Sequence, residues 1–466
     1  MADPKIIEPS KILIAGEWVL SASADCVDLK DPTRLQLIGR VPSCGQSDVG
    51  RALDAATAAA AVWAHIPRAE KVQRLVAIGT QVRVHAKALA DCLALESGKP
   101  LMEAYDCVRA VAERFETPES CVSSASLRPS TVTVVLTPQS APLLMLAYFV
   151  VPALMAGSAV VIKPPQACPL STLLLGRLLQ HLPSGVVSIV TGGAQTGQQL
   201  AAASQVATVA FAGSAGVGRA IETAVIGAGK GFWGELGSSD AVLVCADSPL
   251  DTVVPALVWA RLRNVGRSCL APKRMYLERS IADEFVLQAH LCLADIEFGD
   301  PLLSSTDVGP LASLEAIRRV EDQVAYSMKA GARLVVGGMR FRPAGLPGFF
   351  FQPTILTGAS DTMRVMREEV LGPVLTIQVV DDIATAMTSQ LAAGLGRRIG
   401  VFTQDVARVA DLSARVPACS VWVNQPLTDA DVYGVTSLEA SAADADRRWP
   451  AVGFPYKHRP APDQDT

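Results

Sequence analysis

A cysteine and a glutamate are the side chains in this sequence that could carry covalent chemistry. Cys269 lies in the run Asn-Val-Gly-Arg-Ser-Cys-Leu-Ala-Pro-Lys-Arg, with basic residues on both sides. A thiol acts as a nucleophile in its thiolate form, which a positive field stabilises. Glu235, in the run Trp-Gly-Glu-Leu-Gly, supplies a carboxylate that can activate water as a general base. If the two side chains lie within reach of one bound intermediate, the carboxylate can activate water against it.

Each of these residues also has a purely structural interpretation. The chain contains ten cysteines, and any single one of them is more often a packing residue than a nucleophile. A lone glutamate is more often a solvated surface group. The cysteines form no Cys-x-x-Cys pair and no Cys/His spacing suited to zinc, so the sequence predicts neither a disulfide framework nor a metal site.

Two further features are suited to binding phosphate and sugar groups. The glycine-rich segment 213–218 follows the apolar run 206–211, where a strand is expected to enter a helix. Backbone N–H groups at such a turn face a phosphate, although the segment is not a G-x-G-x-x-G fingerprint and a simple turn is an alternative. Lys163 ends another apolar run, where it would lie over the ligand-binding crevice of a parallel sheet or else be solvated.

The elements that must position these residues alternate between strand and helix. The N-terminal part predicts a hairpin over 12–20 and helices over 47–64, 69–85, 86–95 and 101–114, with Ser47 and Asp48 as capping candidates for the first helix. Strands are then predicted at 131–136, 159–163, 186–190 and 206–211, with helices at 143–155, 171–180 and 197–203, and a second α/β series over 241–424. This alternation predicts an α/β fold built on a doubly wound parallel sheet.

Composition limits the class of protein. A chain of 466 residues is too long for one hydrophobic core, so two or three domains are expected. The net charge of −4 comes with dispersed basic residues, which argues against a nucleic-acid partner. The N-terminus lacks the pattern of a signal peptide, which favours a cytoplasmic location.

One uncharged segment, 141–162, is long enough to span a bilayer. Pro152 and Gly157 interrupt it, and its last residues have the short β-branched character of a strand. A buried helix, a turn and a buried strand explain it better, so no membrane partner is expected.

The segments around Cys269 and Glu235 resemble the nucleophile and general-base motifs of the aldehyde dehydrogenase superfamily, and the resemblance covers about residues 10–424. The run 264–274 is similar to N-x-G-Q-x-C-x-A-x-x-R, with Arg267 in place of Gln. The resemblance implies that Cys269 attacks the substrate and that Glu235 activates water for hydrolysis of a thioester.

The same resemblance implies a binding site for NAD or NADP. The run Phe-Ala-Gly-Ser, which ends in Gly213 and Ser214, is similar to the family's F-T-G-S loop at the pyrophosphate. Lys163 resembles the lysine that binds a ribose. Gln166 stands where members that prefer NAD often carry Glu, so the choice between NAD and NADP stays open.

A third motif resembles the family's E-E-x-F-G-P-V, here Glu-Glu-Val-Leu-Gly-Pro-Val. The resemblance implies that Glu369 holds the hydroxyls of the nicotinamide ribose. Leu371 replaces the Phe that stacks on the cofactor, and it offers a smaller apolar contact.

One catalytic position departs from the family pattern. The run 137–142 reads Thr-Pro-Gln-Ser-Ala-Pro where the family has T-P-W-N-F-P, so Ser140 replaces the Asn whose amide donates to the oxyanion. Loss of one such donor typically costs on the order of 10²–10³ in rate. The shorter Ser140 side chain is the candidate substitute, and the backbone N–H of Cys269 is the other donor.

The resemblance also divides the chain. It implies a dinucleotide-binding domain over 1–236, a catalytic domain over 237–424 and a divergent C-terminal segment over 425–466. The connection near 117–130 is shorter than in the family, and the segment after 424 is altered. Both changes affect the usual subunit contact, so a monomer or an atypical homodimer is expected.

The implied function is NAD(P)-dependent oxidation of a small-molecule aldehyde to a carboxylic acid, through a thiohemiacetal and a thioester on Cys269. The alternative is a catalytically weakened paralogue that binds a nucleotide or a partner protein, which Ser140 and the altered C-terminal region favour. Reduction of an acyl phosphate is a third option, and it gives Glu235 no role. Which aldehyde is oxidised stays open.

Overall fold

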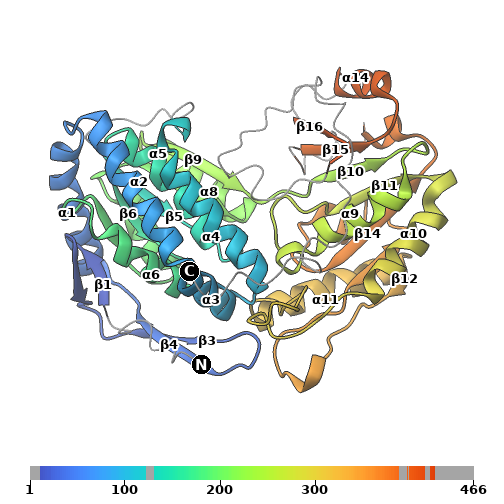
Figure 1. Cartoon of the computed structure of the whole chain (residues 1–466), viewed down its shortest axis with the longest axis horizontal. Coiled ribbons are helices and arrows are strands. Elements are labelled where there is room, and N and C mark those ends of the chain that lie inside the picture. The colour runs from blue at the N-terminus through green and yellow to red at the C-terminus, as the bar shows by residue number, and fades with distance from the viewer. Residues whose placement is uncertain (1–10, 122–130, 388–395, 397, 415–419, 426–466) are drawn as a thin grey trace.

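Two seven-stranded sheets organise the chain in the computed structural model, which describes residues 11–121, 131–387, 396, 398–414 and 420–425. The strands of the first sheet come from residues 11–236 and those of the second from 241–423. Figure 1 shows the two sheets in separate lobes, with the first in blue to green and the second in yellow-green to red. Sequence alternation therefore predicted the α/β class correctly.

The first sheet has the order β2-β1-β7-β6-β5-β8-β9, and its five strands from β5 to β9 are parallel. The order reverses at β5, with β6 and β7 on one side and β8 and β9 on the other. Strands β5, β6 and β7 are buried almost throughout, as expected for a parallel sheet that is covered on both faces. The strands are β1 (Lys11–Ile14), β2 (Glu17–Leu20), β5 (Val132–Leu136), β6 (Ala159–Lys163), β7 (Val187–Ile189), β8 (Val206–Gly213) and β9 (Gly231–Leu236).

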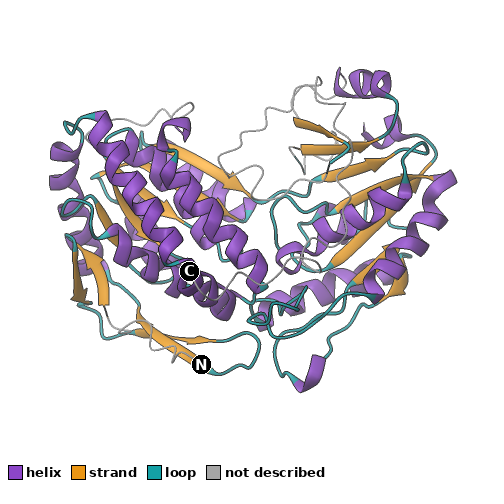
Figure 2. Ribbon diagram, viewed as in Figure 1, coloured by secondary structure: helices purple, strands orange, loops and turns teal. Residues whose placement is uncertain are grey.

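Helices cover both faces of this sheet (Figure 2). One face packs against α1 (Gln46–Trp63), α7 (Ala194–Ala202) and α8 (Ala215–Gly227), and the other packs against α5 (Pro142–Met155) and α6 (Leu170–Leu179). An outer layer lies on α5 and α6, formed by α2 (Arg68–Val84), α3 (Ala86–Ser97) and α4 (Leu101–Glu116). The strands β3 (Cys26–Lys30) and β4 (Leu37–Pro42) form a separate hairpin that the sequence did not predict.

The second sheet has the order β12-β13-β14-β11-β10-β15-β16, and its order reverses at β10. All neighbouring strands from β13 to β16 are parallel. The strands are β10 (Ala241–Val244), β11 (Arg274–Glu278), β12 (Arg333–Val336), β13 (Thr354–Thr357), β14 (Val374–Val380), β15 (Arg398–Phe402) and β16 (Ser420–Val423). The helical segments of this half are α9 (Leu250–Leu262), η2 (Arg263–Gly266), α10 (Arg279–Ala294), α11 (Leu314–Lys329), η3 (Pro343–Gly345), α12 (Arg364–Arg367) and α14 (Val406–Ala414).

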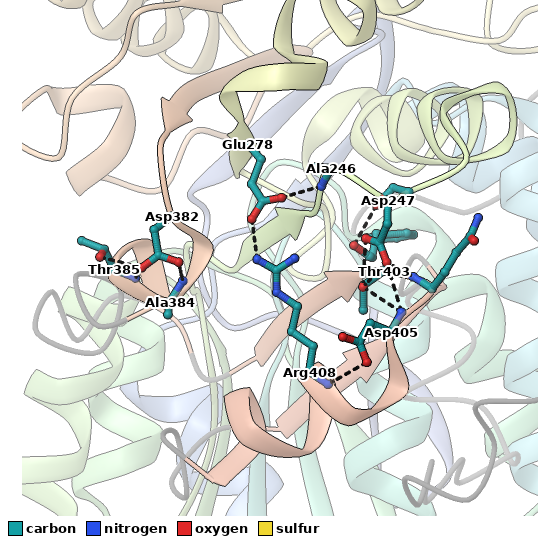
Figure 3. A network of polar contacts seen from close by, with 12 residues as sticks. Ala246, Asp247, Glu278, Asp382, Ala384, Thr385, Thr403, Asp405 and Arg408 are labelled. Carbon is teal, nitrogen blue, oxygen red and sulfur yellow. Dashed lines mark hydrogen bonds and ion pairs between the residues drawn. The ribbon is translucent and has the colours of Figure 1, made fainter.

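Polar side chains close the carboxyl edge of the second sheet (Figure 3). Asp247, which follows β10, accepts hydrogen bonds from the Thr403 hydroxyl and from the backbone N–H groups of Gln404 and Asp405, at 2.8 to 3.1 Å. Glu278, at the end of β11, accepts from the backbone N–H of Ala246 at 2.6 Å and pairs with Arg408 of α14. These groups satisfy one another at the strand ends.

The apolar segment 141–162 forms a buried helix, a turn and a buried strand, as the sequence predicted. Helix α5 ends at Met155, Gly157 adopts a φ of 90° in the turn, and β6 begins at Ala159. Within the described residues, no helix is long and apolar enough to cross a membrane.

The capping prediction for the first long helix was wrong. Helix α1 begins at Gln46 after Gly45, and neither Ser47 nor Asp48 caps it. The buried Asp48 carboxylate instead accepts hydrogen bonds from the Ser21 hydroxyl and the Ala22 N–H, at 2.6 and 2.9 Å. The side chain is therefore used to fix the chain that follows β2.

Two predicted departures from the family fall mainly outside the described residues. Of the connection near 117–130, only Thr117 and the short helix η1 (Pro118–Cys121) are described. Of the C-terminal segment 425–466, only Gln425 is described.

Candidate active site

A cavity of about 270 Å³ lies between the two sheets. It is bounded on one side by segments at the carboxyl edge of the first sheet and on the other by segments that precede strands of the second. Seven of the expected catalytic and cofactor-binding residues line it: Ser140, Gly213, Ser214, Glu235, Cys269, Glu369 and Leu371. The remaining lining residues are Pro138, Gln139, Ala141, Met145, Ala212, Leu236, Gly237, Arg267, Ala312 and Ala316.

The topology of the first sheet explains its side of the cavity. Ser140 follows β5, Gly213 ends β8, and Glu235 lies near the end of the neighbouring strand β9. Because the strand order reverses between β5 and β8, the connections leave these strand ends in opposite directions and open a crevice there. The three residues therefore meet although they are distant in sequence.

The opposite side is built from two loops that enter the second sheet. Cys269 precedes β11, and Glu369 and Leu371 precede β14. Before Cys269, the residues Asn264, Val265 and Gly266 adopt φ values of 51°, 60° and 70° in succession. This left-handed conformation is unfavourable for a β-branched residue such as Val265, so the surrounding packing must hold it.

Gly266 is required at this position by a close approach of the two loops. A Cβ added to Gly266 would lie 2.1 Å from the carbonyl oxygen of Gly372. The segment that carries Cys269 is thus pressed against the loop that carries Glu369. Only glycine permits both the positive φ and this contact.

Asn264 ties the cysteine segment to the loop after β5. Its side-chain amide donates to the backbone carbonyl of Ser140 at 2.7 Å, and its backbone N–H donates to the carboxylate of Glu103 at 2.8 Å. The position of Ser140 relative to Cys269 is therefore fixed through its backbone by a residue of the nucleophile segment.

Basic residues beside Cys269 are used in different ways. The fully buried Lys273 donates its Nζ to the carbonyl oxygen of Cys269 at 3.0 Å and pairs with Glu369 at 3.3 Å. Arg267 donates to the carbonyl oxygens of Ser97 and Asn264 at 2.8 and 3.0 Å, and burial lowers its pKa to about 10. Lys273 thus links the cysteine segment to the predicted ribose-binding glutamate.

The carboxylate of Glu235 has a partner that sequence inspection missed. The hydroxyl of Tyr148, on α5, donates to Glu235 Oε1 at 3.3 Å. Burial and, to a smaller extent, the charge of Glu235 raise the pKa of Tyr148 to about 12, so the phenol stays protonated at neutral pH. A signal was present, because Tyr148 carries the one polar side chain of the apolar helix α5, and a hydroxyl that is largely removed from water needs a partner.

The cavity wall includes backbone suited to a dinucleotide. Ser214 is the N-cap of α8 and makes no side-chain capping hydrogen bond, which leaves the N–H groups of the first turn without that internal acceptor. A Cβ added to Gly216, in that turn, would meet nothing within 4 Å. On the opposite wall, the Glu369 carboxylate lies close to Gly237. A Cβ added to Gly237 would be 2.2 Å from Oε2 of Glu369.

Lys163 and Gln166 are not among the residues that line the cavity; Lys163 is the last residue of β6, and Gln166 lies in the turn that follows. The Nζ of Lys163 donates to the carbonyl oxygens of Pro164 and Gly192 at 2.8 and 3.0 Å, and burial lowers the pKa of Lys163 to about 8. The side-chain amide of Gln166 lies over Gly193, at the start of α7. A Cβ added to Gly193 would be 2.8 Å from Oε1 of Gln166. Both side chains thus meet the turn between β7 and α7.

Among the described residues, no cluster of three or more His, Cys, Asp or Glu side chains could hold a metal ion. The free thiols include Cys269, which is half-buried at the cavity; the others are Cys26, Cys44, Cys92, Cys107, Cys168, Cys245 and Cys292.

The aldehyde dehydrogenase family model matches residues 18–437 of the chain. A 3,6-anhydro-alpha-L-galactose dehydrogenase from Streptomyces coelicolor is 33% identical over 433 residues, with 88% of each chain covered. A succinate-semialdehyde dehydrogenase [NADP(+)] from Escherichia coli is 28% identical, with 92% of each chain covered.

Solved structures agree with these relatives. An NADP-dependent enzyme from E. coli superposes with a TM-score of 0.85 at 27% identity, covering 92% of both chains. A Pseudomonas syringae aldehyde dehydrogenase, solved with NAD+ and octanal, gives a TM-score of 0.85 at 29% identity over 90% of both chains.

Proposed function

The chain belongs to the aldehyde dehydrogenase family, and on that premise we propose that Cys269, Glu235 and Ser140 are its catalytic residues. Its reaction is the oxidation of an aldehyde to a carboxylic acid with NAD or NADP. The observation that carries the residue assignment is the shared cavity. Glu235 lies on β9 of the first sheet and Cys269 on a loop that enters the second, yet both line it.

The sequence of steps follows from the chemistry of these two side chains. The thiolate of Cys269 attacks the aldehyde carbon and forms a thiohemiacetal. Loss of hydride from that carbon leaves a thioester. Water, deprotonated by Glu235, then attacks the thioester carbonyl; the C–S bond breaks, the carboxylic acid leaves and the thiolate returns. Covalent capture divides one difficult oxidation into two easier steps.

The oxyanion of the thiohemiacetal needs hydrogen-bond donors. We assign this role to the backbone N–H of Cys269 and the hydroxyl of Ser140, which lines the same cavity. Asn264 holds the carbonyl of Ser140 and so restrains the loop that presents this hydroxyl. A serine reaches less far than the asparagine of the family pattern, so a slower reaction than that of a typical member is expected.

The residues around the cavity fit a dinucleotide. The first turn of α8, with Gly213 and Ser214, would offer N–H groups to a pyrophosphate, and Glu369 would hold the nicotinamide ribose, with Leu371 as an apolar contact; Gly213, Ser214, Glu369 and Leu371 all line the cavity. Lys163 and Gln166 are assigned to the adenosine ribose. Bound NAD or NADP supplies the hydride acceptor. Gln166 carries no charge that would repel a 2′-phosphate, so both cofactors are compatible with the site.

The division of the chain and its assembly also stand as proposals. We infer a dinucleotide-binding domain over 1–236 and a catalytic domain over 237–424, which meet at the cavity. A monomer or an atypical homodimer, located in the cytoplasm, is expected. Sedimentation equilibrium of the purified protein checks the assembly.

The test of the function is reduced nicotinamide formation by the purified protein with a panel of aldehydes, run with NAD+ and NADP+ in parallel. Turnover that disappears in Cys269→Ala supports the assignment and identifies the cofactor. A folded protein that binds the nucleotide but oxidises none of a broad panel would instead support the weakened paralogue.

A further inference from the structure

Tyr148 is placed to act on the general base. It projects from α5, whose other side chains are all apolar, and its hydroxyl donates to Glu235 Oε1 at 3.3 Å. The two residues are 87 positions apart in the sequence. Because the phenol stays protonated at neutral pH, it acts as a neutral donor to the carboxylate.

The ring of Tyr148 is held by contacts from three elements. Its centroid lies 5.4 Å from that of Phe149 on α5 and 5.4 Å from that of Trp233 on β9. The guanidinium of Arg114, on α4, lies over the ring at 5.1 Å. Such contacts restrict the ring, so the direction of its hydroxyl is restricted as well.

The strand that carries Glu235 supplies one of these contacts itself. Trp233 and Glu235 are two residues apart on β9, so their side chains point to the same face of the sheet. That face meets α5, where Trp233 also packs edge-on against Phe149 at 4.8 Å. The packing of β9 on α5 therefore also fixes the position of Tyr148 relative to Glu235.

The length of the hydrogen bond between Tyr148 and Glu235 indicates how strongly it restrains the carboxylate. At 3.3 Å it exceeds the usual O–H···O distance of about 2.7–2.8 Å, so it restrains the carboxylate without locking it. A general base must be oriented toward the attacking water, and hydrogen bonds in a free site often shorten when the reaction complex forms.

We propose that Tyr148 is a positioning residue for thioester hydrolysis, whose hydroxyl orients the Glu235 carboxylate toward the water that attacks the thioester on Cys269. This proposal rests on the function proposed above for Glu235. It assigns to Tyr148 the step in which the water proton passes to Glu235 and the C–S bond breaks, and no part in the formation of the thioester.

The experiment measures hydrolysis directly in the full-length enzyme. p-Nitrophenyl acetate acetylates Cys269 with release of p-nitrophenolate, and intact-protein mass spectrometry follows loss of the acetyl group. Tyr148→Phe keeps the ring and removes the hydroxyl. We expect acetylation at the wild-type rate and hydrolysis slowed about fivefold to tenfold, the size of effect expected for loss of one hydrogen bond. Cys269→Ala gives the background from other thiols.

Hydroxylamine provides the second readout. It is a strong nucleophile that attacks the thioester without a general base and releases the hydroxamate. We expect it to remove the acetyl group from wild type and Tyr148→Phe at the same rate. The matched control is Tyr105→Phe, which deletes the same atom from a half-buried tyrosine of α4 outside the cavity lining and should hydrolyse like wild type.

The companion variant Glu235→Gln separates the two levels of the proposal. If it hydrolyses the acetyl-enzyme as fast as wild type, the assignment of Glu235 fails. If it is slow but Tyr148→Phe is not, the role of Tyr148 alone is overturned. Slow removal by hydroxylamine in Tyr148→Phe, or an undiminished effect of Tyr148→Phe in the Glu235→Gln background, would also overturn it.

Discussion

The two sheets share a topological feature and use it in opposite ways. Each contains a point where the strand order reverses, between β5 and β8 in the first and between β10 and β15 in the second. Parallel sheets open a crevice at the carboxyl ends of the strands at such a point. In the first sheet this edge borders the cavity that Ser140, Gly213 and Glu235 line. In the second, Asp247 bridges from the end of β10 to Thr403, which follows β15.

The difference lies in where the polar groups find their partners. At the second edge, the Asp247 carboxylate accepts from a hydroxyl and from two backbone N–H groups, and Asn424 exchanges hydrogen bonds with the backbone of Thr403. At the first edge, Ser140 and Glu235 still face the cavity. The same topology therefore borders a cavity in one sheet and a set of polar groups that bridge the strand ends in the other.

The largest effect at the cavity is expected from Cys269→Ala. Removal of the proposed nucleophile should lower aldehyde turnover by more than about 10⁴-fold, because no covalent intermediate could form. The half-buried thiol makes a small contribution to packing, so urea unfolding should change by less than about 1 kcal/mol. Residual turnover at a tenth of wild type would place the nucleophile elsewhere.

A substitution at the carboxyl edge of the second sheet should change the stability of the protein and leave its reaction rate unchanged. Asp247→Ala removes a charged acceptor from the exposed backbone N–H groups of Gln404 and Asp405, which water can then solvate, so the unfolding free energy should fall by about 1–2 kcal/mol. The kcat of the folded fraction should stay at the wild-type value. Equilibrium urea unfolding and active-site titration measure the two quantities. A large fall in kcat with unchanged stability would show that this edge also takes part in the reaction.

Ser140, the proposed oxyanion donor, offers a gain of function at the edge of the first sheet. Ser140→Asn should raise kcat with an aldehyde by about tenfold or more, since a longer amide donor reaches further into the cavity than a hydroxyl. Steady-state kinetics with the best aldehyde of the panel test this, with Ser140→Ala as the matched loss of the donor. A variant no faster than wild type, beside an unimpaired Ser140→Ala, would remove position 140 from the oxyanion site.

The smallest expected effect concerns Lys163. Its ammonium group loses its proton as the pH rises through about 8, because burial has lowered its pKa below the ordinary value. Affinity for the anionic cofactor should therefore weaken several-fold between about pH 7 and 9.5, while Lys163→Met should bind more weakly at neutral pH and show little pH dependence over this range. Titration calorimetry with NAD+ measures both; a pH dependence that survives in Lys163→Met would exclude Lys163 as its source.

Much of the fold could be predicted from local sequence. The β-branched run 159–163 and the apolar helix before it were assigned from patterning that packing then preserved. The separate hairpin of β3 and β4 was missed because its strands alternate weakly, and β4 contains a glycine. The N-cap of α1 was misjudged because the Asp48 side chain turned to the loop after β2, a choice that local rules do not contain.

The sequence by itself determined which chemistry is possible. It placed a cysteine among basic residues, a glutamate before a glycine turn and a glycine-rich entry to a helix, and their motifs identified the family. These features are local, so they can be identified from the amino-acid sequence alone.

The tertiary structure alone decided which groups meet. Tyr148 reaches Glu235 across 87 residues, Asn264 reaches Ser140 across 124, and Lys273 joins Cys269 to Glu369. It also turned Arg267 toward the carbonyl oxygens of the interior. Such contacts depend on how two sheets and their loops pack against one another, and the spacing of residues along the chain does not specify that packing.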